Sequence, residues 1–112
     1  MPDFTSIYRI YVFVPKTHFD DYLSKIQDHI PSFNGPYDRV LWWSDGHEQF
    51  RPLEGANPVS GEINKTSRTP TIKLEISFPD NEHALKIFLK DVVKANHSWE
   101  KPIILVNKYL SY

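Results

Sequence analysis

The chain has 112 residues, of which 40% are apolar and 14% aromatic, and this predicts a single domain over residues 1–112 with a core rich in rings. Thirteen Lys and Arg against fourteen Asp and Glu leave a net charge of −1, which argues against a nucleic-acid binder held by phosphate contacts. The absence of cysteine excludes disulfides, thiolate metal sites and cysteine nucleophiles.

The first third of the chain predicts a strand followed by a helix. Residues 7–14 are mostly β-branched or aromatic and end at Pro15, which is typical of a strand with both faces largely buried. Apolar residues then recur at helical spacing over residues 19–30. Thr17 is the expected N-cap and Pro31 the expected end of this helix.

A second strand and a hairpin are expected next. The run 37–44 has Val40, Leu41, Trp42 and Trp43 at its centre and reads as a strand. The dipeptide at 45–46, Asp-Gly, is a turn signal, so a hairpin could form between residues 43 and 50.

The stretch from residue 50 to residue 63 predicts a loop with a defined shape. It contains two prolines, two glycines and the pair Asn57-Pro58, all of which favour turns. It also contains apolar side chains that a disordered linker would not need, namely Phe50, Leu53, Val59 and Ile63.

The last part of the chain repeats the order strand, helix, strand. Residues 71–78 alternate apolar and polar side chains, which indicates a strand with one buried face. Asp80 or Asn81 is expected to cap a helix with an apolar face over residues 85–93, and residues 103–106 form the closing strand. The complete order predicts an α+β, ferredoxin-like βαββαβ fold, with an antiparallel sheet, two helices on one face and an extra hairpin or loop.

The sheet face opposite the helices needs a partner. Ile7, Tyr11 and Phe13 lie on one face of the first strand, and the other apolar residues of that strand lie on the opposite face. An apolar face left in water promotes association. We therefore expect this second face to pack against another copy of the chain or to be covered by the central loop.

Two motifs resemble a known family. Residues 50–58 read Phe-Arg-Pro-Leu-Glu-Gly-Ala-Asn-Pro, and His97, Glu100 and Pro102 belong to a segment before the closing strand. They resemble the Leu-Glu-Gly-Ala-Asn-Pro motif and the His-Pro-Tyr-Glu-Glu-Pro-like segment in the inserted domain of the NGG-interacting-factor-three family, also called YqfO-like proteins. The likeness runs from about residue 8 to about residue 109. The departures in the second segment are Ser98, Trp99 and Lys101.

This resemblance implies a domain without the family's reaction centre. Full-length members carry a dimetal site of histidines and acidic residues in two lobes that flank the insert, whereas this chain corresponds to the insert alone. The hydrolase or cyclohydrolase activity attached to the family is therefore not expected from any residue here. The closing segment is also similar to that of the CutA proteins, which are trimers of the same PII-like architecture.

Three residues are candidates for a divalent-metal site. His97 and Glu100 lie at a corner where neighbouring subunits meet in CutA-like trimers, and His47 is a possible third ligand. The alternative for His97 is a structural turn into the last strand. The five histidines show no local spacing typical of a metal site, so any such site requires convergence in space.

Four residues are candidates for binding a small molecule. Glu54 and Asn57 could present polar groups from the loop, and Gly55 would let backbone N–H groups approach an anion. Trp43 could stack on a ligand, although an interface or an ordinary core position would equally explain it. The alternative for the loop is a structural or oligomer-locking role, because no phosphate-binding motif follows it.

The sequence thus predicts a non-enzymatic binding or regulatory module that forms a homodimer or homotrimer. The ligand of this module, a small molecule or a divalent metal, would lie between subunits near the loop and the 97–100 corner. The sequence does not identify a cofactor. The alternatives are a CutA-type metal-binding protein and, third, an enzyme. We expect a cytoplasmic protein with no membrane or nucleic-acid partner, because no apolar run approaches the ~20 residues that span a bilayer and the start does not read as a signal peptide.

Overall fold

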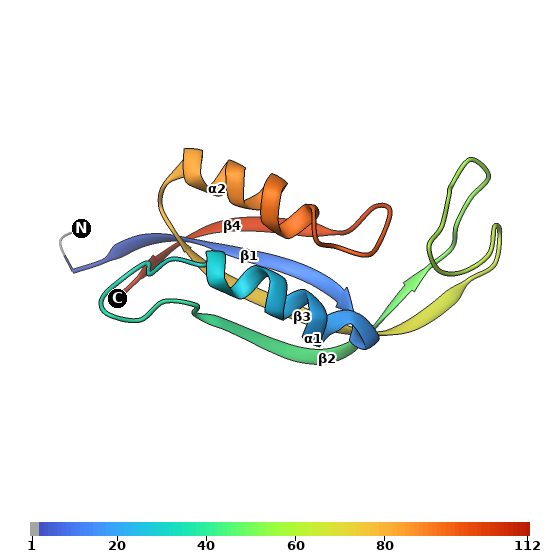
Figure 1. The fold of residues 1–112 in the computed structure, drawn as a ribbon, viewed down its shortest axis with the longest axis horizontal. Coiled ribbons are helices and arrows are strands. Elements are labelled where there is room, and N and C mark those ends of the chain that lie inside the picture. Colours follow the sequence, from blue (N-terminus) through green and yellow to red (C-terminus); the bar gives the residue numbers. More distant parts are fainter. Residues whose placement is uncertain (1–2) are drawn as a thin grey trace.

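The computed structural model describes residues 3–112 and contains a four-stranded sheet covered by helices on one face (Figure 1). The strands have these bounds: β1 Thr5–Pro15, β2 Leu41–Phe50, β3 Ser67–Pro79 and β4 Ile104–Ser111. Neighbouring strands are antiparallel, and their order across the sheet is β2-β3-β1-β4. This order, with helices after β1 and after β3, is the predicted ferredoxin-like α+β fold.

Two helical segments cover the sheet. The first consists of a 3₁₀ turn Lys16–His18, α1 Phe19–Ile26 and a second 3₁₀ turn Gln27–His29, and the second consists of α2 Glu82–Phe88 and a π-helical turn Leu89–Lys94. The residues that each segment buries belong to the apolar faces that the spacing predicted. Within residues 3–112 no helix has the length and apolar character needed to cross a membrane.

The starts of the two helices show one correct and one wrong prediction. Asn81 is the N-cap of α2, and its Oδ1 accepts a hydrogen bond from the Ala84 N–H at 3.0 Å. Thr17 does not cap α1, because the chain enters this helix through the 3₁₀ turn and the cap position falls on His18. A 3₁₀ turn of this kind is common at helix starts, and here it moves the cap position past Thr17, the residue type that is preferred at N-caps.

The core lies between the helices and the facing side of the two central strands. In the register of β1 with β3, Ile10 is opposite Ile76 and Val12 is opposite Leu74, and all of these side chains are fully buried. To this core the helical segments contribute Phe19, Tyr22, Ile26, Leu85, Phe88 and Val93. Tyr22 also donates its hydroxyl to the Val93 carbonyl at 2.7 Å, so the two helical segments are joined by a buried hydrogen bond.

Strands β2 and β3 continue past the rest of the sheet as a long hairpin arm. Pairing of β1 with β3 ends at Thr71, yet β2 stays paired with β3 as far as Phe50 and Ser67. The arm and the loop 51–66 at its tip extend beyond the sheet (Figure 1), and the molecule measures 52 × 24 × 23 Å.

The hairpin turn predicted at residues 45–46 is wrong. Asp45 and Gly46 are ordinary members of β2 and lie opposite Ile72 and Thr71 of β3. The Asp-Gly signal is local, and the long-range pairing with β3 overrides it because extended backbone at 46–50 gains a full set of partners. The true hairpin connection is the loop 51–66, and β2 starts only at Leu41.

The sheet face away from the helices is open. The register places Trp42, Glu75, Tyr11 and Leu105 in one row across β2, β3, β1 and β4. Trp42 is 51% exposed and Leu105 is 54% exposed. Beside this row, the Arg9 Nε bonds the Glu75 Oε1 at 3.1 Å. The tip loop extends past the end of the sheet (Figure 1) and does not cover this face, so that expectation is wrong; packing against another copy stays a prediction.

The closing strand is twice as long as its apolar pattern suggested. The sequence predicted residues 103–106, whereas β4 pairs with β1 as far as Ser111, opposite Thr5. Polar residues interrupt the apolar pattern after Val106, but backbone pairing does not depend on them. One side of β4 is an unpaired edge.

Removal of core volume at the centre of the sheet should strongly destabilise the fold. Leu74→Ala is expected to lower the free energy of unfolding by about 2–5 kcal/mol, because the cavity adds to the lost burial. Chemical denaturation monitored by circular dichroism measures this change. The control is Ile87→Ala on α2, where the side chain is 48% exposed and the expected loss is below about 1 kcal/mol. Equal losses for the two variants would contradict the assigned core.

Candidate functional site

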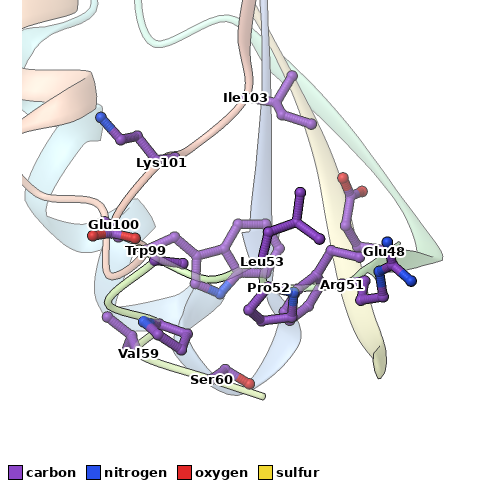
Figure 2. Close-up of a pocket in the computed structure, with 13 residues that line it drawn as sticks. Glu48, Arg51, Pro52, Leu53, Val59, Ser60, Trp99, Glu100, Lys101 and Ile103 are labelled. Carbon is purple, nitrogen blue, oxygen red and sulfur yellow. The ribbon is translucent and has the colours of Figure 1, made fainter. Parts of the chain in front are cut away.

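An open groove lies between the tip loop and the segment that leads into β4. Its volume is about 380 Å³. Figure 2 shows side chains from the end of β2, from the loop and from residues 99–103 around one hollow. We call it the tip groove, and its lining residues are Glu48, Phe50, Arg51, Pro52, Leu53, Ala56, Pro58, Val59, Ser60, Trp99, Glu100, Lys101 and Ile103.

The lining of the tip groove is mainly apolar. The rings of Phe50 and Trp99 lie 6.2 Å apart at a tilt of 55° and connect the arm to the segment before β4. The apolar side chain of Leu53 is 55% exposed, and that of Val59 is 68% exposed. Exposed apolar groups gathered in a concave site are typical of a place where a ligand or partner binds.

The tip loop holds its shape through its own backbone. The Ala56 N–H donates to the Leu53 carbonyl at 3.0 Å, and the Asn64 N–H donates to the Pro52 carbonyl at 2.6 Å. Pro52 is buried beneath the loop. Gly61 has φ +86°, and a Cβ built there would lie 3.1 Å from the Phe50 ring. These contacts agree with the prediction of a shaped loop rather than a linker.

His97 anchors the segment on the other side of the groove. Its Nε2 lies 2.7 Å from the Phe13 carbonyl, and its Nδ1 lies 3.0 Å from the Trp99 backbone nitrogen. A carbonyl only accepts and a backbone N–H only donates, so the proton resides on Nε2 and the ring is neutral. Burial lowers the pKa of His97 below its ordinary value of 6.5, and the bond to Phe13 opposes this only in part.

Glu100 joins the two walls of the groove. Both of its carboxylate oxygens accept from the Asn57 N–H, at 3.2 and 3.3 Å. This is a charge-assisted contact between the tip loop and the segment before β4. This contact holds the loop and the 97–100 corner together. The sequence analysis had assigned both to one functional region but could not show that they are in contact.

The charged groups around the groove are not equivalent. Glu100 is engaged with the loop backbone, whereas Glu48, Arg51 and Lys101 form no ion pair within residues 3–112. Glu48 is half-buried, and Arg51 and Lys101 are exposed. Figure 2 shows Glu48 and Arg51 on the same side of the hollow, with Lys101 and Glu100 on the opposite side.

The structure divides the residues predicted to bind a small molecule. Glu54, Gly55 and Asn57 are exposed on the tip loop, and Gly55 has φ +96°. Only Asn57 contacts the opposite wall. Trp43 is separate from them: it points to the helix side of the sheet and packs on Phe19, with ring centroids 5.3 Å apart.

The predicted metal set does not assemble. Both ring nitrogens of His97 are used by the backbone, and the Glu100 carboxylate is used by Asn57. His47 lies on the arm beside Lys16 and Asp45, in a different depression. The part of the chain that the structure describes contains no group of three or more His, Cys, Asp or Glu able to hold a metal ion. The residue types had suggested metal ligands, but hydrogen bonds within the fold engage His97 and Glu100.

Sequence reasoning missed the residues that form the groove. Phe50 and Leu53 were recognised only as anchors of the loop, and Trp99 only as a departure from a family motif. Pattern analysis could not pair them because the loop and residues 99–103 are far apart in the chain. The available signal was indirect: apolar residues in a stretch rich in turn formers need something to pack on.

The chain is similar to one part of longer proteins. It is 29% identical over 108 residues to a Staphylococcus epidermidis protein named GTP cyclohydrolase 1 type 2 homolog, which matches 94% of this chain and 29% of the relative. A Bacillus cereus protein related to NIF3 superposes with a TM-score of 0.73 at 21% identity, over 96% of this chain and 28% of that one. No family model matches the sequence. The chain therefore spans less than a third of these relatives, and its resemblance to the NGG-interacting-factor-three family is confirmed.

The fold is also shared with a small PII-like protein. GlnK from B. subtilis, solved as a complex with ATP, superposes with a TM-score of 0.52 at 13% identity. The match covers 93% of this chain and 82% of GlnK. At this level of identity the likeness concerns the fold, and it agrees with the PII-like arrangement of strands and helices predicted from the sequence.

Acid should weaken the fold through His97. The unfolded ring takes up a proton near pH 6.5, whereas the folded ring, with its lowered pKa, does so only at lower pH. The free energy of unfolding therefore falls as the pH drops below 6.5 towards the folded pKa. Urea unfolding between about pH 7.5 and pH 5 should show this fall, with a smaller one in His97→Gln. A difference between wild type and variant that does not change with pH would contradict the neutral, buried ring.

Substitution at Gly61 should disturb the groove. Gly61→Ala places a methyl group against Phe50 and also strains a backbone with positive φ, so an unfolding cost of about 1–3 kcal/mol is expected. Gly35→Ala is the matched control, because Gly35 has φ +80° but no atom within 4 Å of the added group. The fluorescence of Trp99 should change in the first variant only. Identical behaviour of the two variants would show that Phe50 does not depend on the space left by Gly61.

Proposed function

We propose that this chain is a non-enzymatic binding module that self-associates and holds a small ligand in the tip groove. The observation that carries the proposal is the groove itself, an apolar hollow whose walls are joined by the Asn57 and Glu100 contact. Small-molecule sites are typically concave, apolar and equipped with a few polar groups, and they have volumes of roughly 300–1,000 Å³. The value of 380 Å³ fits the lower end of this range and favours a small ligand.

The open sheet face supports self-association. Trp42, Tyr11 and Leu105 lie in one row on this face, and Leu105 belongs to the edge strand β4. A second copy would remove these apolar side chains from water and could also pair with the free edge. A homodimer or homotrimer satisfies both demands, and ligand sites near the 97–100 corner would then lie close to neighbouring subunits.

The comparisons favour binding over catalysis for this segment. The curated relatives carry the name GTP cyclohydrolase 1 type 2 homolog, but this chain matches only 29% of the length of one such protein. GlnK, which shares the fold, was solved with ATP bound, so a chain of this architecture can hold a small molecule. His97 has no free ring nitrogen for use as a general base. No described feature favours the CutA-type metal alternative.

Native mass spectrometry of the purified protein tests the proposal because it reports subunit number and bound mass together. An oligomer that carries a small molecule would agree with both halves of the proposal. A ligand-free oligomer would remove the support for binding, and a bare monomer would overturn self-association.

A charge on the open face should dissociate the oligomer. Leu105→Glu introduces a carboxylate that would be buried between subunits, and burial of an unpaired charge strongly opposes association. Size-exclusion chromatography with light scattering should show a dissociation constant at least about 100-fold higher. The control is Ile87→Glu on the helix side, where the exposed fraction is similar, 48% against 54% for Leu105. If both variants keep the wild-type mass, the open face is not the interface.

A further inference from the structure

We propose that the tip groove binds a zwitterionic α-amino acid with an apolar side chain. This inference rests on the proposed binding function and specifies its ligand. It depends on two features that occur together in the groove: an apolar surface with aromatic rings, and the unpaired side chains of Glu48 and Arg51 on one side of it.

The apolar surface suits the side chain of such a ligand. Phe50, Trp99, Leu53 and Ile103 surround the hollow, and the two rings contact each other at a tilt that leaves parts of both accessible from the groove. Figure 2 shows the Trp99 indole and Leu53 near the middle of the hollow. A phenyl or branched aliphatic group placed there would be removed from water and packed against rings.

The charges at one side suit the head group. Glu48 is near the end of β2 and Arg51 is the first residue of the tip loop, and Figure 2 shows both on one side of the hollow. No ion pair forms between them or from either to any other residue in the range 3–112. The Glu48 carboxylate is therefore available to a ligand ammonium, and the Arg51 guanidinium is available to bind the ligand carboxylate in two-point fashion.

The opposite side of the groove is less suited to a second charged group. Glu100 is occupied by the Asn57 N–H, and the Lys101 ammonium points away from the hollow in Figure 2. The usable polar groups are therefore concentrated at the Glu48 and Arg51 side. An α-amino acid carries its ammonium and carboxylate on one carbon and its apolar group on the same carbon, which matches this one-sided arrangement.

The test uses Trp99 as the reporter. In a Trp42→Phe/Trp43→Phe background, Trp99 is the remaining tryptophan, and its fluorescence is followed while L-phenylalanine is added. Saturable binding is expected. N-acetyl-L-phenylalanine, which lacks the ammonium, and L-phenylalaninamide, which lacks the carboxylate, should each bind about ten-fold more weakly, because each loses one charge-assisted contact.

Variants assign the two contacts. Glu48→Gln should weaken L-phenylalanine and its amide about ten-fold and leave the N-acetyl compound unchanged, whereas Arg51→Gln should weaken L-phenylalanine and the N-acetyl compound and leave the amide unchanged. Lys90→Gln, at an exposed lysine of the turn Leu89–Lys94 outside the groove, is the matched charge control and should change none of the three. Leu53→Asp should abolish binding, with Ile87→Asp as its control on a half-exposed residue outside the groove.

The outcomes separate this inference from the function on which it rests. Equal binding of the three compounds would overturn the zwitterion but keep the groove as a binding site. A loss in Lys90→Gln equal to that in Arg51→Gln would overturn the assigned contact between Arg51 and the ligand carboxylate. No response to L-phenylalanine up to about 10 mM would overturn the inference completely. The subunit number and bound mass from native mass spectrometry would then decide separately whether the proposed function also fails.

Discussion

The pairing of β2 with β3 beyond the end of β1 is the constraint on which the rest of the molecule depends. From His47 to Phe50 the arm has only its partner strand for support, opposite residues 67–70. This extension carries the tip loop clear of the helices and gives it a free side.

The second requirement is that this segment meets the loop at a fixed position. His97 binds the Phe13 carbonyl at the end of β1 and orients the Trp99 backbone, and Glu100 then reaches the Asn57 N–H. These hydrogen bonds connect β1, the 97–100 corner and the tip loop, and so fix the position of the groove relative to the core. The buried, neutral imidazole is hydrogen-bonded at both ring nitrogens and thereby fixes the corner before β4.

The two sheet faces have different roles. The helix side is closed by apolar packing around Leu74 and Ile76, which are fully buried. The open side combines exposed rings with the Arg9 and Glu75 pair, a mixture that agrees with a surface able to meet both water and a partner. The proposed self-association and the proposed ligand binding would use separate surfaces of one small fold, the first across the sheet and the second at the tip of the arm.

The sequence by itself determined the order of strands and helices, the apolar faces of both helices, a helix cap at Asp80 or Asn81 and the shaped character of residues 50–63, because these follow from local spacing and from backbone preferences. It could not determine that Asp45-Gly46 stays extended, that β4 continues to Ser111, or that Trp99 packs on Phe50. Each of these depends on a partner that is distant in the chain. The candidate site was located only in part for the same reason: Asn57 and Glu100 were identified by type, while their contact and the groove beside it were decided by tertiary structure.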